Sequence, residues 1–163
     1  MFEPDKWTIF AAAIVGAAGT LMGLFVVAIS VRLDIATTRR AAATRGAQTL
    51  LLLTMPFVAG LLVLIPDQPS RLLGLEFILT AGTFGVALLL LDRRALTQHA
   101  STDHLSRIVH GLSPNLMVTI GLMFAGGSLA IEWGGGLYWL VPTVILSVLG
   151  GVLSAWLFLV EQV

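Results

Sequence analysis

The sequence predicts an all-α polytopic membrane protein, a bundle of five transmembrane helices. Three observations predict this class. Five apolar stretches, each about 20 residues long, occupy about two-thirds of the chain. Apolar residues make up 57% of the 163 residues and charged residues only 11%, and the mean hydropathy is +0.96. No stretch shows the alternating polarity that is typical of a transmembrane β-strand.

The apolar stretches define the expected spans. These are Trp7–Val31, Ala47–Ile65, Leu72–Leu91, Leu112–Ile131 and Leu137–Val160. Inside lipid every backbone N–H and C=O must find a partner within its own segment, so each stretch is expected to be a helix. Spans and connectors use nearly all of residues 1–163, and we therefore expect a single transmembrane domain.

The first span is expected to be an anchor. The leader Met1–Lys6 carries Glu3 and Asp5 beside Lys6, so it lacks the basic region of a secretory signal. The apolar run that follows is also longer than the apolar region of such a signal. We therefore expect this helix to stay in the membrane.

The charges of the connectors predict the orientation. Seven of the nine basic residues follow the first or the third span. The positive-inside rule makes that side cytoplasmic, so the N-terminus is expected outside and the C-terminus inside, in the plasma membrane of a bacterium. Tight outer turns are expected at Pro66–Ser70 and Gly134–Gly136, where Gln68 and Gly135 should be exposed. Aromatic residues at Trp7, Trp133, Tyr138 and Trp139 agree with this outer boundary.

Glu76 is the main candidate for function, because an ionisable residue inside a span is costly and is often kept for a role. Thr80 and Thr83 continue its face at helical spacing, and Arg71 at the mouth of the span is a candidate partner for it. Glu76 lies only about 6 Å into the span, at 1.5 Å per residue. It is therefore either a pore or ligand residue or a structural residue that reaches water or bridges helices. Asp34, after the first span, is a further candidate.

Small residues form two faces suited to close helix packing. The first span places Gly16, Gly19 and Gly23 on one face, and the last span places Ser147, Gly150, Gly151 and Ser154 on another. The packing is expected within one subunit or between subunits. A hinge is expected at Pro56, near the middle of the second span, because proline removes one helical hydrogen bond and frees a carbonyl near position 52.

A metal site is a weaker hypothesis. His99, Asp103 and His110 would share one face if the long inner connector were helical. Their spacing matches no established ligand motif, and a solvated or headgroup-facing surface is the favoured explanation of these residues. The sequence therefore predicts no metal and no other cofactor.

An enzyme is not expected. The sequence contains no phosphate-binding loop, no nucleophile elbow, no zinc-protease motif and no dinucleotide fingerprint. It also has no cysteine, which excludes disulfides and thiolate chemistry. The formal net charge of zero hides a strong asymmetry between the connectors, so it carries no information about partners. We expect no nucleic-acid partner.

Two segments resemble small, uncharacterised, multi-spanning bacterial membrane proteins. One is Gly23–Asp34 at the end of the first span, and the other is the outer turn followed by Gly74, Leu75 and Glu76. The resemblance implies no activity, and it draws attention to Asp34 and Glu76.

Two function classes remain. One is permeation or transport of a small ion or solute by a homo-oligomer, with Glu76, Thr80 and Thr83 near an outer vestibule. The other is a non-catalytic assembly or regulatory subunit whose glycine faces dock to a larger membrane complex. The expected partners are the lipid bilayer and either further copies of the chain or such a complex.

Overall fold

The structure is a computed structural model that describes residues 3–31, 40–98 and 114–160, and the regular structure of these residues is helical. This confirms the all-α class. The elements are two short 3₁₀-helices, η1 (Pro4–Trp7) and η2 (Gly136–Trp139), and five α-helices: α1 (Thr8–Val31), α3 (Arg40–Val63), α4 (Ser70–Gln98), α6 (Pro114–Ala130) and α7 (Leu140–Val160).

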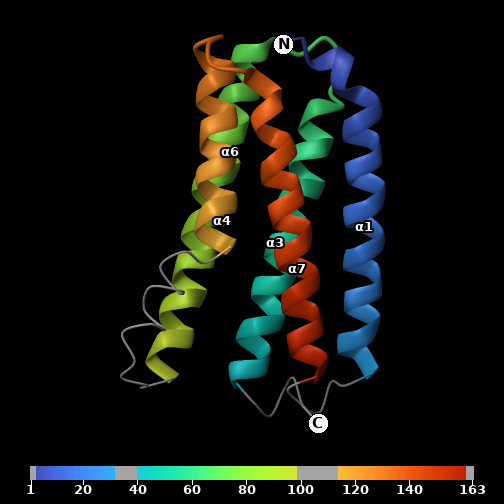
Figure 1. Cartoon of the computed structure of the whole chain (residues 1–163), viewed down its shortest axis with the longest axis vertical. Helices are drawn as coiled ribbons and strands as arrows, with labels where there is room; N and C mark the ends of the chain where they lie inside the picture. The colour runs from blue at the N-terminus through green and yellow to red at the C-terminus, as the bar shows by residue number, and fades with distance from the viewer. Residues whose placement is uncertain (1–2, 32–39, 99–113, 161–163) are drawn as a thin grey trace.

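The α-helices form an up-and-down bundle, in which successive helices run antiparallel (Figure 1). Helix α3 lies centrally and contacts α1, α4 and α7, whereas α4 packs most extensively along α6. Helix α1 lies at the edge of the bundle, because nearly all its helix contacts are with α3. The start of α1 and the end of α7 lie at opposite ends of the bundle (Figure 1).

Four segments of the described residues are long and apolar enough to cross a membrane. They are Pro4–Val31, Gly46–Val63, Ser70–Leu91 and Gly136–Trp156. The fifth apolar helix is shorter, since α6 has 17 residues and so spans about 25 Å at 1.5 Å per residue. The chain therefore has the helices of a membrane protein, and a fifth crossing by α6 remains a prediction.

Two helices extend beyond the spans that hydropathy predicts. Helix α3 begins at Arg40 rather than Ala47, and α4 continues to Gln98 rather than ending at Leu91. The expectation of connectors there was wrong because hydropathy marks where a helix leaves the apolar layer, not where it ends. The added residues are mostly alanine, arginine, leucine and glutamine, which favour helix in any solvent.

Glycines allow α4 and α6 to approach closely. A Cβ built at Gly74 would lie 2.7 Å from the Gly126 carbonyl oxygen and 2.7 Å from the Ala130 nitrogen. Nearer the other end of the pair, a Cβ at Gly85 would lie 2.5 Å from the Thr119 methyl carbon. The two backbones meet at Gly74 and Gly126 because neither residue has a side chain, and Gly85 leaves room for the Thr119 side chain.

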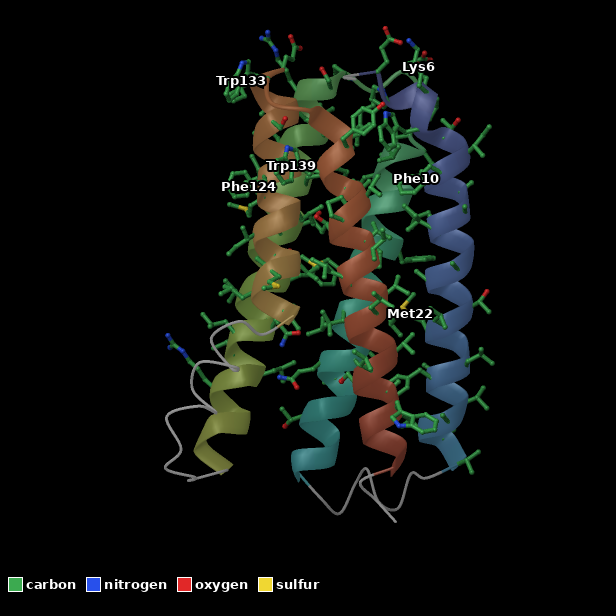
Figure 2. The ribbon with its side chains drawn as sticks, viewed as in Figure 1. Lys6, Phe10, Met22, Phe124, Trp133 and Trp139 are labelled. Carbon is green, nitrogen blue, oxygen red and sulfur yellow. The ribbon has the colours of Figure 1, made fainter. Side chains whose placement is uncertain are left out.

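Hydrogen bonds and ring contacts hold the connectors together at one end of the bundle. Gly134, Gly135 and Gly136 all have positive φ, as the predicted glycine turn requires. The Ser128 hydroxyl donates to the Trp133 carbonyl and accepts from the Gly136 N–H. Tyr138 packs edge-on against Trp7, with 4.9 Å between ring centroids, and so ties η2 to η1. Trp133 and Lys6 mark this end in Figure 2.

Candidate functional site

Glu76 is half-buried on the second turn of α4, and its partner is a glutamine. The Gln68 amide nitrogen donates to the Glu76 carboxylate, with 2.6 Å between Nε2 and Oε2. Gln68 is only 8% exposed, so the expectation that it is exposed in the outer turn was wrong. The turn folds the side chain inward, and Asp67 at its tip takes a left-handed backbone conformation (φ 54°).

One atom of this pair lacks a partner. The Gln68 amide oxygen is buried and accepts no hydrogen bond from any residue that the structure describes. Buried amide oxygens are rarely left in this state, because removal from water costs free energy that a hydrogen bond normally offsets. The pair thus combines a carboxylate with an unsatisfied acceptor.

The structure does not pair Arg71 with Glu76. Arg71 instead forms an ion pair with Glu132, with 3.3 Å between Nε and Oε1, and the Ser70 hydroxyl donates to the same oxygen. Arg71 precedes Glu76 by five positions on the helix, so the two side chains point to different faces. Among the described residues, Glu76 therefore has no cationic partner.

The two threonines below Glu76 lie toward the outside of the bundle. Thr80 is half-buried and Thr83 is exposed. The Thr83 hydroxyl bonds to carbonyls of its own helix, those of Leu79 and Thr80. The neighbouring face of α4 is apolar and buried, with Leu73, Phe77 and Ala81 in the core. The polar stripe therefore follows the flank of α4 and not the interior of one chain.

The glycine face of α1 is open. A Cβ at Gly16 or Gly23 would meet nothing within 4 Å, whereas one at Gly19 would touch the Phe57 ring at 3.4 Å. The buried residues of α1 are instead Ala11, Ile14, Ala18 and Phe25. Gly16 and Gly23 do not mediate packing with the described residues of their own chain.

The small face of α7 lies against α3. The Ser147 hydroxyl donates to the Leu52 carbonyl, and the Thr49 hydroxyl donates to Ser154 at 2.7 Å. A Cβ at Gly151 would lie 2.7 Å from the Leu53 side chain, and Gly150 is buried as well.

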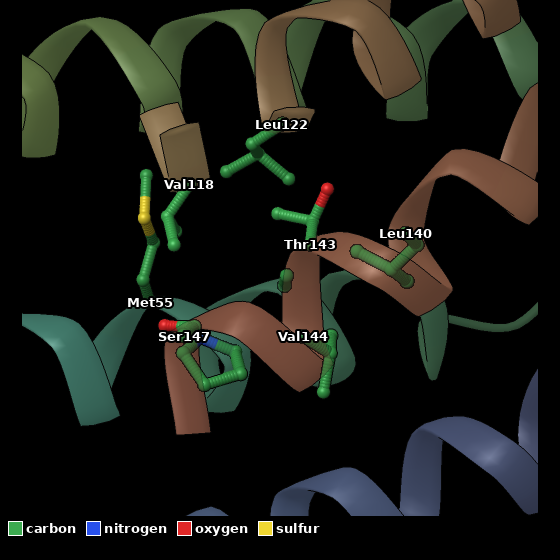
Figure 3. Close-up of a pocket in the computed structure, with 9 residues that line it drawn as sticks. Met55, Val118, Leu122, Leu140, Thr143, Val144 and Ser147 are labelled. Atoms are coloured by element: carbon green, nitrogen blue, oxygen red, sulfur yellow. The ribbon is translucent and has the colours of Figure 1, made fainter. Parts of the chain in front are cut away.

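Pro56 lies inside α3 beside a small apolar cavity. Met55 and Pro56 line it from α3, Val118 and Leu122 from α6, and Thr143 and Ser147 from α7 (Figure 3). It has room for about one water molecule. Both hydroxyls at this cavity donate to backbone carbonyls, Thr143 to Trp139 and Ser147 to Leu52, so the cavity presents mainly apolar surface.

The remaining candidates lie outside the described residues. These are Asp34, His99, Asp103 and His110. Within the described ranges, no three histidine, aspartate or glutamate side chains gather where they could hold a metal ion.

Sequence reasoning missed Gln68. A glutamine between two prolines gives no signal of burial, although its place eight residues before Glu76 brings it within reach of that carboxylate once the turn folds back. Comparison of the chain with protein-family models, with curated proteins and with solved structures finds no match.

Proposed function

We propose that this protein is a non-enzymatic, five-span protein of the bacterial plasma membrane that moves a small cation as a homo-oligomer, with its N-terminus outside. The observation that carries the proposal is Glu76. It is the one acidic, basic or histidine residue in the five expected spans, and no described cation neutralises it. Charged groups at such positions commonly serve ion pathways.

The position of the polar stripe supports an oligomeric path. Core residues fill the bundle beneath Glu76, and the cavity beside Pro56 is small and apolar. Thr80 and Thr83 lead from Glu76 toward the outer surface of α4. A second copy must pack against this stripe to enclose it. A path shared between copies therefore agrees with the half-buried position of Thr80 and the exposed position of Thr83.

Flux measurements test the proposal. Purified protein in proteoliposomes should conduct or exchange Na⁺, K⁺ or Rb⁺ along an imposed gradient. Glu76→Gln keeps the shape of the side chain and its hydrogen bond from Gln68 but removes the charge, so we expect flux to fall at least about tenfold, equivalent to 1.4 kcal/mol. Glu132→Gln is the matched control, because it removes an exposed carboxylate at the same end of the bundle. Wild-type vesicles without flux for any small cation would overturn the proposal.

A second candidate function is an accessory subunit of a larger membrane complex. The specific observation in its favour is the open glycine face of α1, at Gly16 and Gly23, on a helix that packs against little besides α3. Close approach of small residues is a common basis of helix association in lipid. Because the chain has no cysteine, a crosslinker attached at Gly16→Cys reports its neighbour directly. Capture of a second copy supports the homo-oligomer, and capture of one different membrane protein supports the accessory role.

A further inference from the structure

We infer that Gln68 and Glu76 together form a binding site for one monovalent cation, with the Gln68 amide oxygen as a direct ligand. The inference rests on the proposed function for its role in transport and adds to it a second residue and a class of ion. The observation behind it is the amide oxygen, which is buried on a side chain 8% exposed and accepts no hydrogen bond from the described residues.

The surroundings of this oxygen favour a cation over a neutral donor. The amide nitrogen of the same group donates to the Glu76 carboxylate at 2.6 Å. That hydrogen bond polarises the amide and increases the negative charge on its oxygen. The carboxylate lacks a cationic partner among the described residues, since Arg71 is paired with Glu132. A cation on the amide oxygen would satisfy the acceptor and offset the nearby charge.

The charge of the site points to a monovalent ion. One carboxylate balances one positive charge, and a partly buried site is least costly when its net charge is zero. Ca²⁺ usually takes six to eight oxygen ligands, often from several carboxylates, and Mg²⁺ requires near-octahedral coordination. An amide oxygen beside a single carboxylate is a better match for Na⁺, K⁺ or ammonium.

A purely structural role explains the pair less well. If Gln68 served only to tie the outer turn to α4, its nitrogen would complete that task, and burial of the amide oxygen would oppose folding. A bound ion would coordinate the buried oxygen and offset this cost.

Equilibrium binding tests the site without any need for flux. Thermal unfolding of the purified full-length protein in detergent is followed by tryptophan fluorescence while NaCl, KCl or NH₄Cl replaces N-methylglucamine chloride at constant ionic strength. We expect a saturable rise in the wild-type midpoint with at least one of these ions. Glu76→Gln and Gln68→Met, which keeps the side-chain length but removes the amide oxygen and nitrogen, should each weaken the apparent affinity at least tenfold. Glu132→Gln should bind as the wild type does.

The outcomes separate the site from the transport function. A wild type without any ion-specific rise overturns the inference, because a water molecule then satisfies the amide oxygen. The inference is also overturned if the ion raises the unfolding midpoint of Glu76→Gln and of Gln68→Met as much as that of the wild type. If Gln68→Met does not fold, Gln68→Asn, which withdraws the oxygen by one methylene, takes its place with the same expectation. Binding that depends on both residues in a protein without flux supports the site and rejects transport.

Discussion

The Ser147 hydroxyl compensates for a defect that proline creates in α3. Pro56 has no N–H, so the carbonyl of Leu52 one turn earlier loses its helical partner. Ser147 on α7 donates to that carbonyl, and both Leu52 and Ser147 are buried. The sequence predicts the free carbonyl from proline chemistry alone, but not its donor, which lies 95 positions away.

Ser147→Ala should therefore destabilise the protein by about 1–3 kcal/mol, the cost of leaving a buried acceptor unpaired. Pro56→Ala restores an N–H that can donate to the same carbonyl. In the Pro56→Ala background we expect Ser147→Ala to cost clearly less, and a double-mutant cycle on unfolding in detergent measures the difference. Ser30→Ala is the control, since the Ser30 hydroxyl is exposed and bonds only within α1. Equal costs of Ser147→Ala in both backgrounds would show that Pro56 and Ser147 act independently.

At the same scale, Glu76 could be singled out from the sequence and Gln68 could not. A carboxylate in an apolar stretch is conspicuous because lipid penalises its charge. A glutamine in a turn is unremarkable, and its burial depends on the left-handed residue at Asp67 and on where the next helix begins. Those backbone details follow from tertiary packing, which local residue type does not specify.

At the scale of elements, the existence of the helices was predictable and their pairing was not. Apolar stretches of about 20 residues form helices whose length matches the thickness of the bilayer core. In lipid, however, every face of such a helix is apolar, so hydrophobicity does not indicate which face meets a neighbour. The glycines of the first span illustrate this, because Gly16 and Gly23 face open space while Gly74 and Gly126 form the close contact.

Gly74→Ala should disturb the α4–α6 pair. The added methyl would lie 2.7 Å from backbone atoms of α6, and backbone cannot move aside as a flexible side chain can, so we expect a loss of about 1–3 kcal/mol. Gly82→Ala on the same helix is the matched control, since its methyl would meet nothing within 4 Å. It should leave stability equal to or slightly above that of the wild type, because alanine favours helix. Thermal or denaturant unfolding in detergent measures both, and equal stabilities would show that the two helices can separate without cost.

The whole molecule is tied together at one end. The ion pair of Arg71 with Glu132 joins the start of α4 to the connector after α6, and the ring contact of Trp7 with Tyr138 joins η1 to η2. These contacts place η1, the start of α4 and the connector between α6 and η2 at the same end of the bundle. With α6 as a crossing, five antiparallel helices then place the start of α1 and the end of α7 on opposite sides (Figure 1).

Single-cysteine labelling tests this orientation, and the absence of native cysteine leaves no background. Asp67→Cys and Trp133→Cys lie at exposed positions in the two connectors that are expected outside, and we expect an impermeant maleimide to modify both on intact cells. Arg93→Cys lies on the exposed side of α4 toward the other end, where the positive-inside rule predicts the cytoplasm, and it should react only after the membrane is permeabilised. Reaction of Arg93→Cys alone on intact cells would invert the orientation. Reaction of Asp67→Cys without Trp133→Cys, when both react in detergent, would place the two connectors on opposite sides and exclude α6 as a crossing.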